Sequence, residues 1–252
     1  MGTMSTAPVT RRQRHRDATV EEIKTVARDL MVREGSSSLN LRAVAREMGM
    51  TASAIYRYFP GRDAILTALI TDAYDAVGEA VEKAMAGAPR DRTATAILAG
   101  VHAFRRWALD HPQEYGLIYG TPVPGYDAPE LATLEPAMRT SFALLGELLR
   151  GTAEGMITPP RDDLLPEPVH ATMAALLQNE SKSALGLTPA TWALALQFWI
   201  LLYGAISSEV FGHLPQMLAA DSGPFFDFSI RRALVVIGLD PQAVDDGVSP
   251  PF

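Results

Sequence analysis

The chain has 252 residues, of which 48% are hydrophobic, with a net charge of −7 and no cysteine. That length accommodates one small and one larger domain, each with a core of its own. Without cysteine, disulfides, thiolate nucleophiles and cysteine metal ligands are excluded, which fits a reducing compartment. No secretory leader or apolar run of membrane-spanning length is recognisable, so we expect a cytoplasmic protein outside any membrane.

The charge is unevenly divided along the chain. Residues 1–68 carry 11 Lys or Arg against 7 Asp or Glu, a net +4, whereas residues 69–252 have a net −11. A basic segment attracts polyanions such as DNA, and an acidic remainder repels them. The division predicts a nucleic-acid contact confined to the N-terminal quarter. Ordinary variation among surface residues is the alternative explanation.

Residues 1–18 are predicted to form a flexible basic arm, because they combine several cations with no apolar periodicity. Such an arm either lies along phosphates or in a minor groove, where it would steepen the salt dependence of binding, or only improves solubility. Its cations are Arg11, Arg12, Arg14, His15 and Arg16.

A first helix is predicted between Thr19 and Gly35. Thr19 and Glu22 have the spacing of a capping box, in which a hydroxyl and a carboxylate satisfy backbone N–H groups at the helix start. Apolar residues then recur at helical spacing over residues 23–31. Gly35 is placed to end the helix.

Two shorter helices are predicted next. The first follows the cap residue Asn40 and ends at Gly49, since glycine accepts the positive φ of a helix stop. The second begins after Thr51, whose hydroxyl is expected to cap it, and turns Ile55 and Phe59 inward. Two short helices joined by a tight glycine turn form a helix-turn-helix, whose second helix enters the major groove of DNA.

These residues resemble the TetR family of bacterial transcriptional regulators. The resemblance covers residues 19–69 and is carried by the runs 41–49 and 54–66. It implies a helix-turn-helix DNA-binding domain at 19–68 and a larger helical ligand-binding and dimerisation domain at 69–239, in an all-α fold. The expected DNA-binding residues are Asn40, Arg42, Thr51, Ala52, Ser53, Tyr56, Arg57, Tyr58 and Arg62, with Thr51, Tyr56, Tyr58 and Arg62 on phosphates and Arg42, Ala52, Ser53 and Arg57 at or near base edges.

Side-chain chemistry supports the same division of roles. The guanidinium of Arg57 can pair with guanine O6 and N7, a contact worth about 1–3 kcal/mol of discrimination. The hydroxyls of Tyr56 and Tyr58 suit phosphate oxygens, which fix register without reporting sequence. Ser53 and Ala52 are weaker readers. In the alternative, the tyrosines are half-buried core residues and Arg57 is a solvated charge.

Beyond residue 69 the pattern stays helical, without a strand signal. The sequence His111-Pro112 marks a sharp break between two of the helices. The helices are expected at 62–85, 94–109, 113–118, 131–155, 169–185 and 189–211, with loops at 121–126 and 156–166 and a flexible tail at 240–252.

The helices 169–185 and 189–211 are predicted to form an antiparallel hairpin, with Thr188 as the cap and Pro189 in the first helical position of the second helix. Apolar residues occupy most of their circumference, which requires burial on more than one side. We therefore expect a homodimer through these two helices of each subunit, arranged as a two-fold four-helix interface.

The same region resembles a subclass of TetR-family C-terminal domains named for a Trp-His-Gly motif. Residues 199–214 keep the frame of that motif, and residues 111–115 agree with it. Tyr203 stands where the histidine is expected, which removes any ligand contact that an imidazole would make.

A pocket for a small, largely hydrophobic effector is expected in the C-terminal domain, because its helices lack clusters of charge. Ordinary core packing is the alternative role of each nominated side chain. The nominated residues are Phe104, Trp107, Tyr115, Tyr119, Met138, Phe142, Met173, Gln178 and Tyr203.

The resulting hypothesis is a regulator that binds a (pseudo)palindromic DNA operator as a homodimer and is released by the effector. Repression is the usual outcome in the family, and activation is the alternative. No cofactor or metal is expected. A helical enzyme would need acid–base or metal groups, but the histidines and Glu114 lack ligand spacing; a protein-binding scaffold is a third hypothesis. The residues considered for the enzyme are His102, His111, Glu114, His170 and His213.

Overall fold

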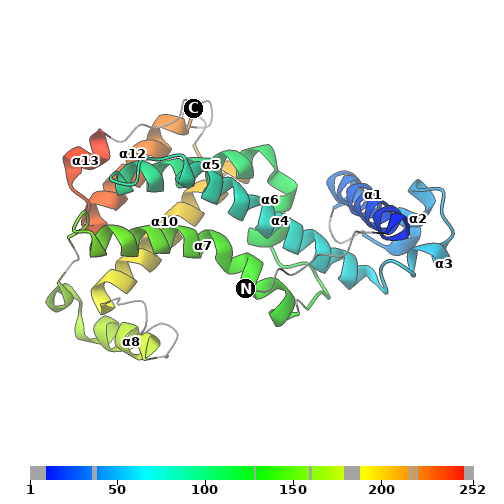
Figure 1. Ribbon diagram of the computed structural model, residues 1–252, viewed down its shortest axis with the longest axis horizontal. Coiled ribbons are helices and arrows are strands. Elements are labelled where there is room, and N and C mark those ends of the chain that lie inside the picture. The colour runs from blue at the N-terminus through cyan, green and yellow to red at the C-terminus, as the bar shows by residue number, and fades with distance from the viewer. Residues whose placement is uncertain are drawn as a thin grey trace, which may run out of the picture. The chain divides into compact units, whose positions relative to one another are not determined.

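The computed structural model describes residues 10–35, 39–127, 129–158, 161–178, 188–215, 218 and 221–246. Across these ranges the fold is all-α, as predicted, and Figure 1 shows the helices in order. An isolated bridge between Ile157 and Leu239 is the one β feature of the described residues. The elements are α1 (Arg11–Glu34), α2 (Leu41–Glu47), α3 (Ala52–Ile55), α4 (Arg62–Ala86), α5 (Thr93–Asp110), α6 (Pro112–Tyr119), α7 (Glu130–Ala153), η2 (Asp162–Leu164), α8 (Glu167–Leu177), α10 (Pro189–Val210), α12 (Gly223–Ile237) and α13 (Pro241–Asp245).

The chain divides into two compact units. The N-terminal unit comprises Met1–Ala73 and Gly116–Thr133, and the body comprises Tyr74–Tyr115 and Leu134–Phe252. The division predicted after residue 68 lies close to the first crossing. The return of the chain to the N-terminal unit at Gly116–Thr133 is a finding that the sequence pattern does not indicate.

Helix α1 begins at Arg11, eight residues before the predicted start at Thr19. Thr10 caps it by accepting a hydrogen bond from the backbone N–H of Gln13 at 3.2 Å. Thr19 lies inside the helix, where its hydroxyl donates to the carbonyl of His15 at 3.0 Å. The prediction of a flexible arm was therefore wrong for residues 10–18, because an earlier cap and arginines of good helix propensity extend the helix. Residues 1–9 lie outside the described part of the chain.

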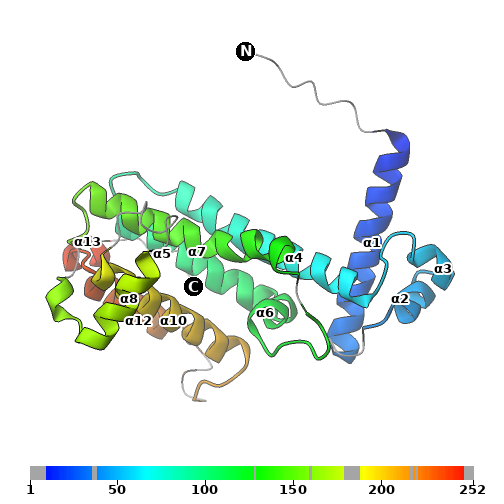
Figure 2. The same ribbon diagram turned by 90° about the horizontal axis from the view of Figure 1, so that it is seen from below.

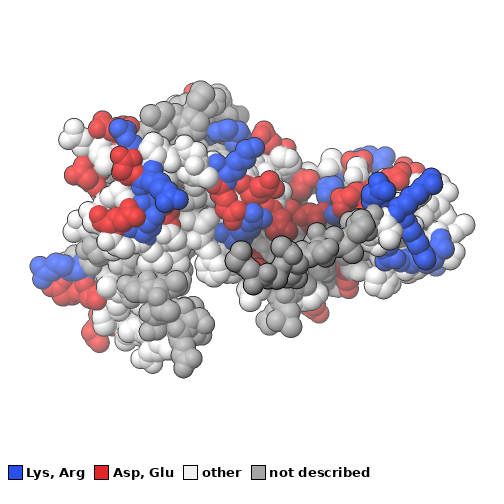
Figure 3. Space-filling model, viewed as in Figure 1, with Lys and Arg blue, Asp and Glu red and all other residues white. Residues whose placement is uncertain are grey.

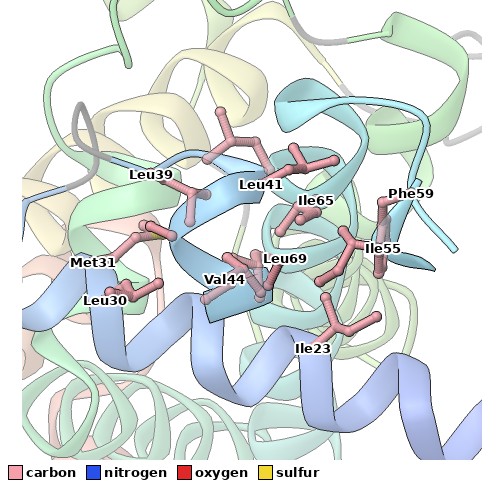
Figure 4. Close-up of a cluster of buried hydrophobic side chains, with 14 of the residues drawn as sticks. Ile23, Leu30, Met31, Leu39, Leu41, Val44, Ile55, Phe59, Ile65 and Leu69 are labelled. Atoms are coloured by element: carbon pink, nitrogen blue, oxygen red, sulfur yellow. The ribbon is translucent and has the colours of Figure 1, made fainter. Parts of the chain in front are cut away.

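The core of the N-terminal unit is built from the predicted apolar stripes (Figure 4). Ile23 of α1, Val44 of α2 and Ile55 of α3 are fully buried and meet Ile65 of α4. Because α2 and α3 are short, their stability comes from burying this face rather than from helix propensity. The core therefore fixes how α2 and α3 are presented.

The segment Gly116–Thr133 is packed into this core. Val123 is 7% exposed and belongs to the same cluster of buried side chains. The hydroxyls of Thr67 and Tyr126 lie 2.9 Å apart, which ties the segment to α4. The loop predicted at 121–126 is present, and through Val123 it contributes to the packing of the N-terminal unit.

In the body, α10 packs against α5, α8 and α12. Thr188 caps α10 by accepting from the N–H of Thr191, and Pro189 takes the first helical position, as predicted. Helix α8 ends at Leu177, and residues 179–185 of the predicted helix 169–185 lie outside the described ranges.

Helix α12 was missed by the sequence analysis. Its buried residues Phe226, Ile230, Leu234 and Ile237 recur at spacings of three and four, which is the pattern of a helix with one buried face. That periodicity was the available signal.

The tail predicted at 240–252 is helical where it is described. Asp240 caps α13 by accepting from the N–H groups of Gln242 and Ala243, and Val244 is fully buried. The expected flexibility was therefore wrong for residues 240–246, because a cap and one buried side chain hold them. Residues 247–252 lie outside the described chain.

Helix α10 also corrects the expectation that no segment reaches membrane-spanning length. By length and composition it is apolar enough to cross a membrane, and 22% of its most apolar stretch is buried in the single chain. A single helix of this kind is weak evidence for a membrane span, since core and interface helices pass the same test. Its packing between α8 and α12 accounts for part of this apolar surface.

Helices α4 and α7 run side by side in the body (Figure 2). The guanidinium of Arg139 on α7 donates to both oxygens of Glu82 on α4, at 2.7 and 2.6 Å. Burial and this pairing act oppositely on the carboxyl, but the hydrogen bonds to Arg139 dominate and lower the pKa of Glu82. Gly78 leaves the space that the Arg139 side chain occupies, since a Cβ there would lie 2.6 Å from Arg139 Cδ.

Candidate DNA-binding surface

The turn between α2 and α3 is built as predicted. The Asn40 side chain accepts from the N–H of Ala43 at 2.9 Å and so caps α2. Gly49 adopts a φ of 64°, which lets the N–H of Met50 donate to the carbonyl of Ala45 at 2.9 Å. This bond fixes the Asn40 side chain at the start of α2.

Helix α3 is one turn long, and hydrogen-bonded turns continue it to Phe59. The N–H of Tyr56 donates to Ala52, and that of Phe59 donates to Ile55 at 3.1 Å. Ile55 and Phe59 are buried, so they anchor the segment from within. The predicted helix thus exists, but only its first turn has regular α geometry.

The exposed side of this segment carries the expected polar groups. Tyr56 is 52% exposed, and Arg42 on α2 is exposed as well. Thr51 precedes α3 but makes no side-chain cap, because its hydroxyl lies 3.1 Å from that of Ser53. The exposed residues at and around the segment are Thr51, Ala52, Ser53, Tyr56 and Arg57.

Tyr58 is half-buried and connects the segment to α1. The guanidinium carbon of Arg16 lies 5.7 Å from the centre of the Tyr58 ring, within range of a cation–π contact. This contact joins the recognition segment to the basic start of α1.

Arg62 makes two hydrogen bonds within the N-terminal unit. Its Nε donates to the carbonyl of Leu39 at 3.1 Å, and Nη1 donates to that of Pro124 at 3.4 Å. These bonds fasten the start of α4 to the entry of α2 and to the inserted segment. The expected contact of Arg62 with a phosphate stays a prediction, and these bonds fix where its guanidinium lies.

Two other cations of the N-terminal unit are also engaged within the fold. Lys24 and Arg28 both pair with Asp72, at 2.7 and 3.0 Å. Burial acts to lower the pKa of Lys24, but its hydrogen bonds to Asp72 and Glu21 outweigh that effect and raise it. Figure 3 shows further Lys and Arg atoms gathered over the helices of this unit.

Some of the predicted effector residues come together in the body. Phe104 and Tyr115 are fully buried, with ring centres 6.2 Å apart. The Tyr115 hydroxyl lies 2.7 Å from that of Ser207 and donates to the carbonyl of Tyr203 at 3.4 Å. Burial raises the pKa of Tyr115 to about 12, so the group stays a neutral hydrogen-bonding phenol.

Others of the nine residues are placed elsewhere. Phe142 is 56% exposed, and Gln178 at the end of α8 is exposed too, so neither lines an enclosed cavity of the single chain. Trp107 stacks on His111 with ring centres 5.4 Å apart, and Tyr119 belongs to the N-terminal unit. Met138 and Met173 are half-buried on α7 and α8.

A buried polar network in the body was missed by the sequence analysis. His102 Nε2 lies 2.9 Å from a carboxylate oxygen of Asp227, and Arg231 Nε donates to the other oxygen at 2.6 Å. Arg105 donates to Glu209 at 2.9 Å. Burial lowers the pKa of His102, although the Asp227 carboxylate partly opposes that shift. The network joins α5, α10 and α12 and gives His102 a structural partner.

The described ranges contain no group of three His, Asp or Glu side chains that could hold a metal ion. The histidines considered for an enzyme do not converge. His111, for example, lies 2.9 Å from the carbonyl of Trp107 at the end of its own helix.

Taken together, a buried three-helix scaffold, a glycine turn and an exposed polar row on the second short helix define a helix-turn-helix DNA-binding protein with a helical body. Residues 23–69 match the model of "Bacterial regulatory proteins, tetR family", and residues 97–233 match "Tetracyclin repressor-like, C-terminal domain". The chain belongs to the TetR family of helix-turn-helix transcriptional regulators, and it binds DNA through that motif. The family is one of regulators and not of enzymes, so the enzyme hypothesis is set aside.

Known relatives extend over nearly the whole chain. The HTH-type transcriptional regulator Rv1816 of Mycobacterium tuberculosis (strain ATCC 25618 / H37Rv) is 33% identical over 234 residues, which cover 92% of this chain and 97% of the relative. The regulator Mb1846 of Mycobacterium bovis (strain ATCC BAA-935 / AF2122/97) matches equally.

Solved structures share the fold. The crystal structure of the regulatory protein SCO4313 is 35% identical with a TM-score of 0.72 and covers 90% of this chain and 100% of its own. RolR in complex with resorcinol has a TM-score of 0.54 at 19% identity and covers 95% of this chain and 98% of its own. The second likeness concerns the fold alone.

Proposed function

We propose that this regulator is a ligand-responsive repressor, which binds a (pseudo)palindromic operator as a homodimer and is released by a small, largely hydrophobic effector in the cytoplasm. The observation that carries the DNA-binding part is the exposed row of Ser53, Tyr56 and Arg57, held outward by the buried Ile55 and Phe59. A rigidly anchored polar row is what groove recognition requires.

Within that row we assign different roles by chemistry. Arg57 is exposed and can pair with a guanine edge, so it reads sequence. Tyr56 offers a phenol to phosphate oxygens and so fixes register. Ser53, Ala52 and Thr51 complete the surface that faces the groove, and Arg42 approaches it from α2.

The effector site is proposed around Phe104, Tyr115 and Tyr203. These side chains combine buried aromatic area with hydroxyl groups, and the neutral Tyr115 phenol favours an uncharged ligand. That a protein of the same fold was solved with resorcinol supports a small-molecule effector, without identifying it. The Trp-His-Gly resemblance of residues 199–214 points to the same part of α10.

The homodimer is proposed to form through α10 together with α8 or α12. On α10, Ile200 is 67% exposed, and on α12 Phe228 and Val236 are 59% and 58% exposed. A shallow apolar groove of about 220 Å³ runs between α10 and α12. Apolar surface of this extent on two neighbouring helices marks a protein interface. The two-fold axis would pair two recognition segments for two half-sites.

Coupling between effector and DNA is proposed to run through helices that belong to both units. α4, α6 and α7 each contribute residues to the N-terminal unit and to the body. A ligand that binds two states of the body with different affinity would shift the DNA-binding state by the same free energy.

The decisive experiment is a binding titration of the full chain with a duplex from the region upstream of its own coding sequence. We expect salt-dependent binding that exceeds binding to a scrambled duplex. Arg57→Ala should cost about 1–3 kcal/mol on the operator and little on scrambled DNA, since it removes one base contact. Fluorescence anisotropy measures both.

Tyr56→Phe serves as the comparison, because losing a phosphate contact should weaken both duplexes alike. Equal losses on both duplexes for Arg57→Ala would contradict its role in readout. Absence of any duplex binding by the wild-type chain would instead favour the protein-binding scaffold.

A further inference from the structure

A groove of about 990 Å³ lies between the first two turns of α1 and the end of the recognition segment. It is distinct from the exposed row described above, although Arg57 belongs to both. The residues that line it are Thr10, Arg11, Arg12, Gln13, His15, Arg16, Arg57 and Tyr58.

Helical geometry selects which arginines face the groove. Successive residues are rotated by about 100° around a helix, so residues 11, 12, 15 and 16 share one side. Arg14 lies about 130° from the middle of that side and does not line the groove. Three of the four N-terminal arginines therefore converge on one space with Arg57.

The groove is strongly cationic. No Asp or Glu lines it, and among the described residues Arg11, Arg12 and Arg16 have no ion pair. The nearest carboxylate in sequence, Asp17, accepts from the Gln13 amide at 2.8 Å. Arg16 is held in place by the Tyr58 ring, 5.7 Å from its guanidinium carbon. Several unpaired cations around a preformed space favour a polyanion.

We propose that this groove holds consecutive phosphates of one DNA strand, beside the major groove entered by the recognition segment. The inference rests on the proposed DNA-reading function, since Arg57 is shared by the two surfaces. DNA is the occupant we choose because one end of the groove is the base-reading residue itself, so a strand followed outward from that contact enters the arginine-lined space. The start of α1 is thus a fixed part of the DNA interface.

The helical start of α1 should bind DNA at a lower entropic cost than a flexible arm would. Its arginines are held at defined positions before DNA arrives, so less conformational entropy is lost on binding. Phosphate contacts carry no sequence information. The groove should therefore raise affinity for all duplexes and extend the footprint, while leaving base preference unchanged.

The test compares Arg12→Gln with Arg14→Gln in the full-length protein. Both remove one exposed charge from the same end of α1, but only Arg12 lines the groove. Affinities for duplexes of about 30 base pairs, long enough for two half-sites one helical turn apart, are measured at several salt concentrations. Each lost phosphate contact should flatten the slope of log affinity against log salt by about 0.9.

We expect Arg12→Gln to flatten that slope by about 0.9 for each protomer and to weaken specific and scrambled duplexes by the same factor, several-fold at low salt. Arg14→Gln should change the slope by less than a third as much. The triple variant Arg11→Gln, Arg12→Gln, Arg16→Gln should lose most of the contribution of the groove to the salt slope, and circular dichroism checks that it folds. If the triple variant does not fold, the comparison of the single variants Arg12→Gln and Arg14→Gln still tests the inference.

If the wild-type chain binds its operator but Arg12→Gln and Arg14→Gln have equal effects on that binding, this inference is overturned and the proposed function is not. A wild-type chain that binds no duplex would overturn the proposed function and this inference with it. Phosphatidylglycerol vesicles serve as a second source of phosphodiesters. If Arg12→Gln weakened binding to vesicles but not to DNA, the groove would be a membrane contact and the inference would be wrong.

Discussion

His102 is a titratable side chain enclosed by the body, at 4% exposure. Its neighbours are Asp227 and Arg231 of α12 and Arg105 of its own helix. Burial lowers its pKa below the ordinary value of 6.5, with the two arginines acting in the same direction and Asp227 opposing them. The neutral imidazole is therefore the form that suits the folded protein.

We expect this group to make the body sensitive to mild acid. As the pH falls below 6.5 the unfolded chain takes up a proton at this histidine more readily than the folded chain, so stability is lost in that range and retained above it. His102→Gln keeps an amide donor for Asp227 but does not titrate. At about pH 7.5 the variant should be less stable by about 1–3 kcal/mol, because a buried hydrogen bond is altered.

The measurement is urea unfolding of both proteins between about pH 7.5 and pH 5. The stability difference between wild type and variant should shrink toward the acid end. Parallel curves across that range would show that His102 does not contribute to the pH dependence.

Residue-level expectations held best where packing sets the outcome. The inward positions Ile23 and Ile55 follow directly from helical spacing and are buried as predicted. Polar side chains were harder to assign, because their partners come from distant parts of the chain. Arg62 bonds to a carbonyl at residue 124, and His102 meets a carboxylate at residue 227, and no local pattern indicates either pairing.

At the level of elements, the contact between α4 and α7 depends on one glycine. Replacing glycine by alanine inside a helix usually stabilises it by about 1 kcal/mol. At Gly78 a Cβ would lie 2.6 Å from Arg139 Cδ, so the Arg139 side chain would have to move off Glu82. The ion pair itself is partly exposed and worth less than about 1 kcal/mol, so the steric overlap decides the sign.

We therefore expect Gly78→Ala to be destabilising, by roughly 1 kcal/mol or more relative to Gly146→Ala. Gly146 lies on α7 and has nothing within 4 Å of its added Cβ, so its replacement should stabilise the protein. Thermal unfolding of the two variants compares them directly. A stabilising Gly78→Ala would mean that Arg139 reorients at little cost.

Element boundaries reveal the limits of the sequence patterns. The predicted helices 62–85 and 94–109 match α4 and α5 to within one residue at each end. The start of α1 was displaced because two threonines could cap it and the earlier one does. Helix α12 was missed although its buried residues recur at helical spacing on one face.

For the whole molecule, substitutions can distinguish the two surfaces through which the proposed dimer could form. The sequence predicted a dimer interface formed by α8 and α10, whereas the exposed Phe228 on α12 favours an interface formed by α10 and α12. An arginine at the centre of an apolar interface buries an unpaired charge and should prevent association. Phe228→Arg and Leu176→Arg on α8 therefore test the two surfaces separately.

We expect Phe228→Arg to yield monomers in light scattering after size-exclusion chromatography, with operator binding weakened because one half-site contact remains. Leu176→Arg should leave the dimer intact. Val32→Arg, on an exposed position of α1, controls for the added charge. The reverse pattern would favour the α8 surface, and dimers in all three would contradict both.

The presence of Val123 in the N-terminal core bears on how such regulators can be recombined. A fragment ending at Ala73 would lack this side chain and the partner of Thr67, and the packing around α4 would be left open. Joining this DNA-binding unit to another ligand-binding domain therefore requires two segments of chain, residues 1–73 and residues 116–133. The two pieces would have to be inherited together in any natural shuffling of modules.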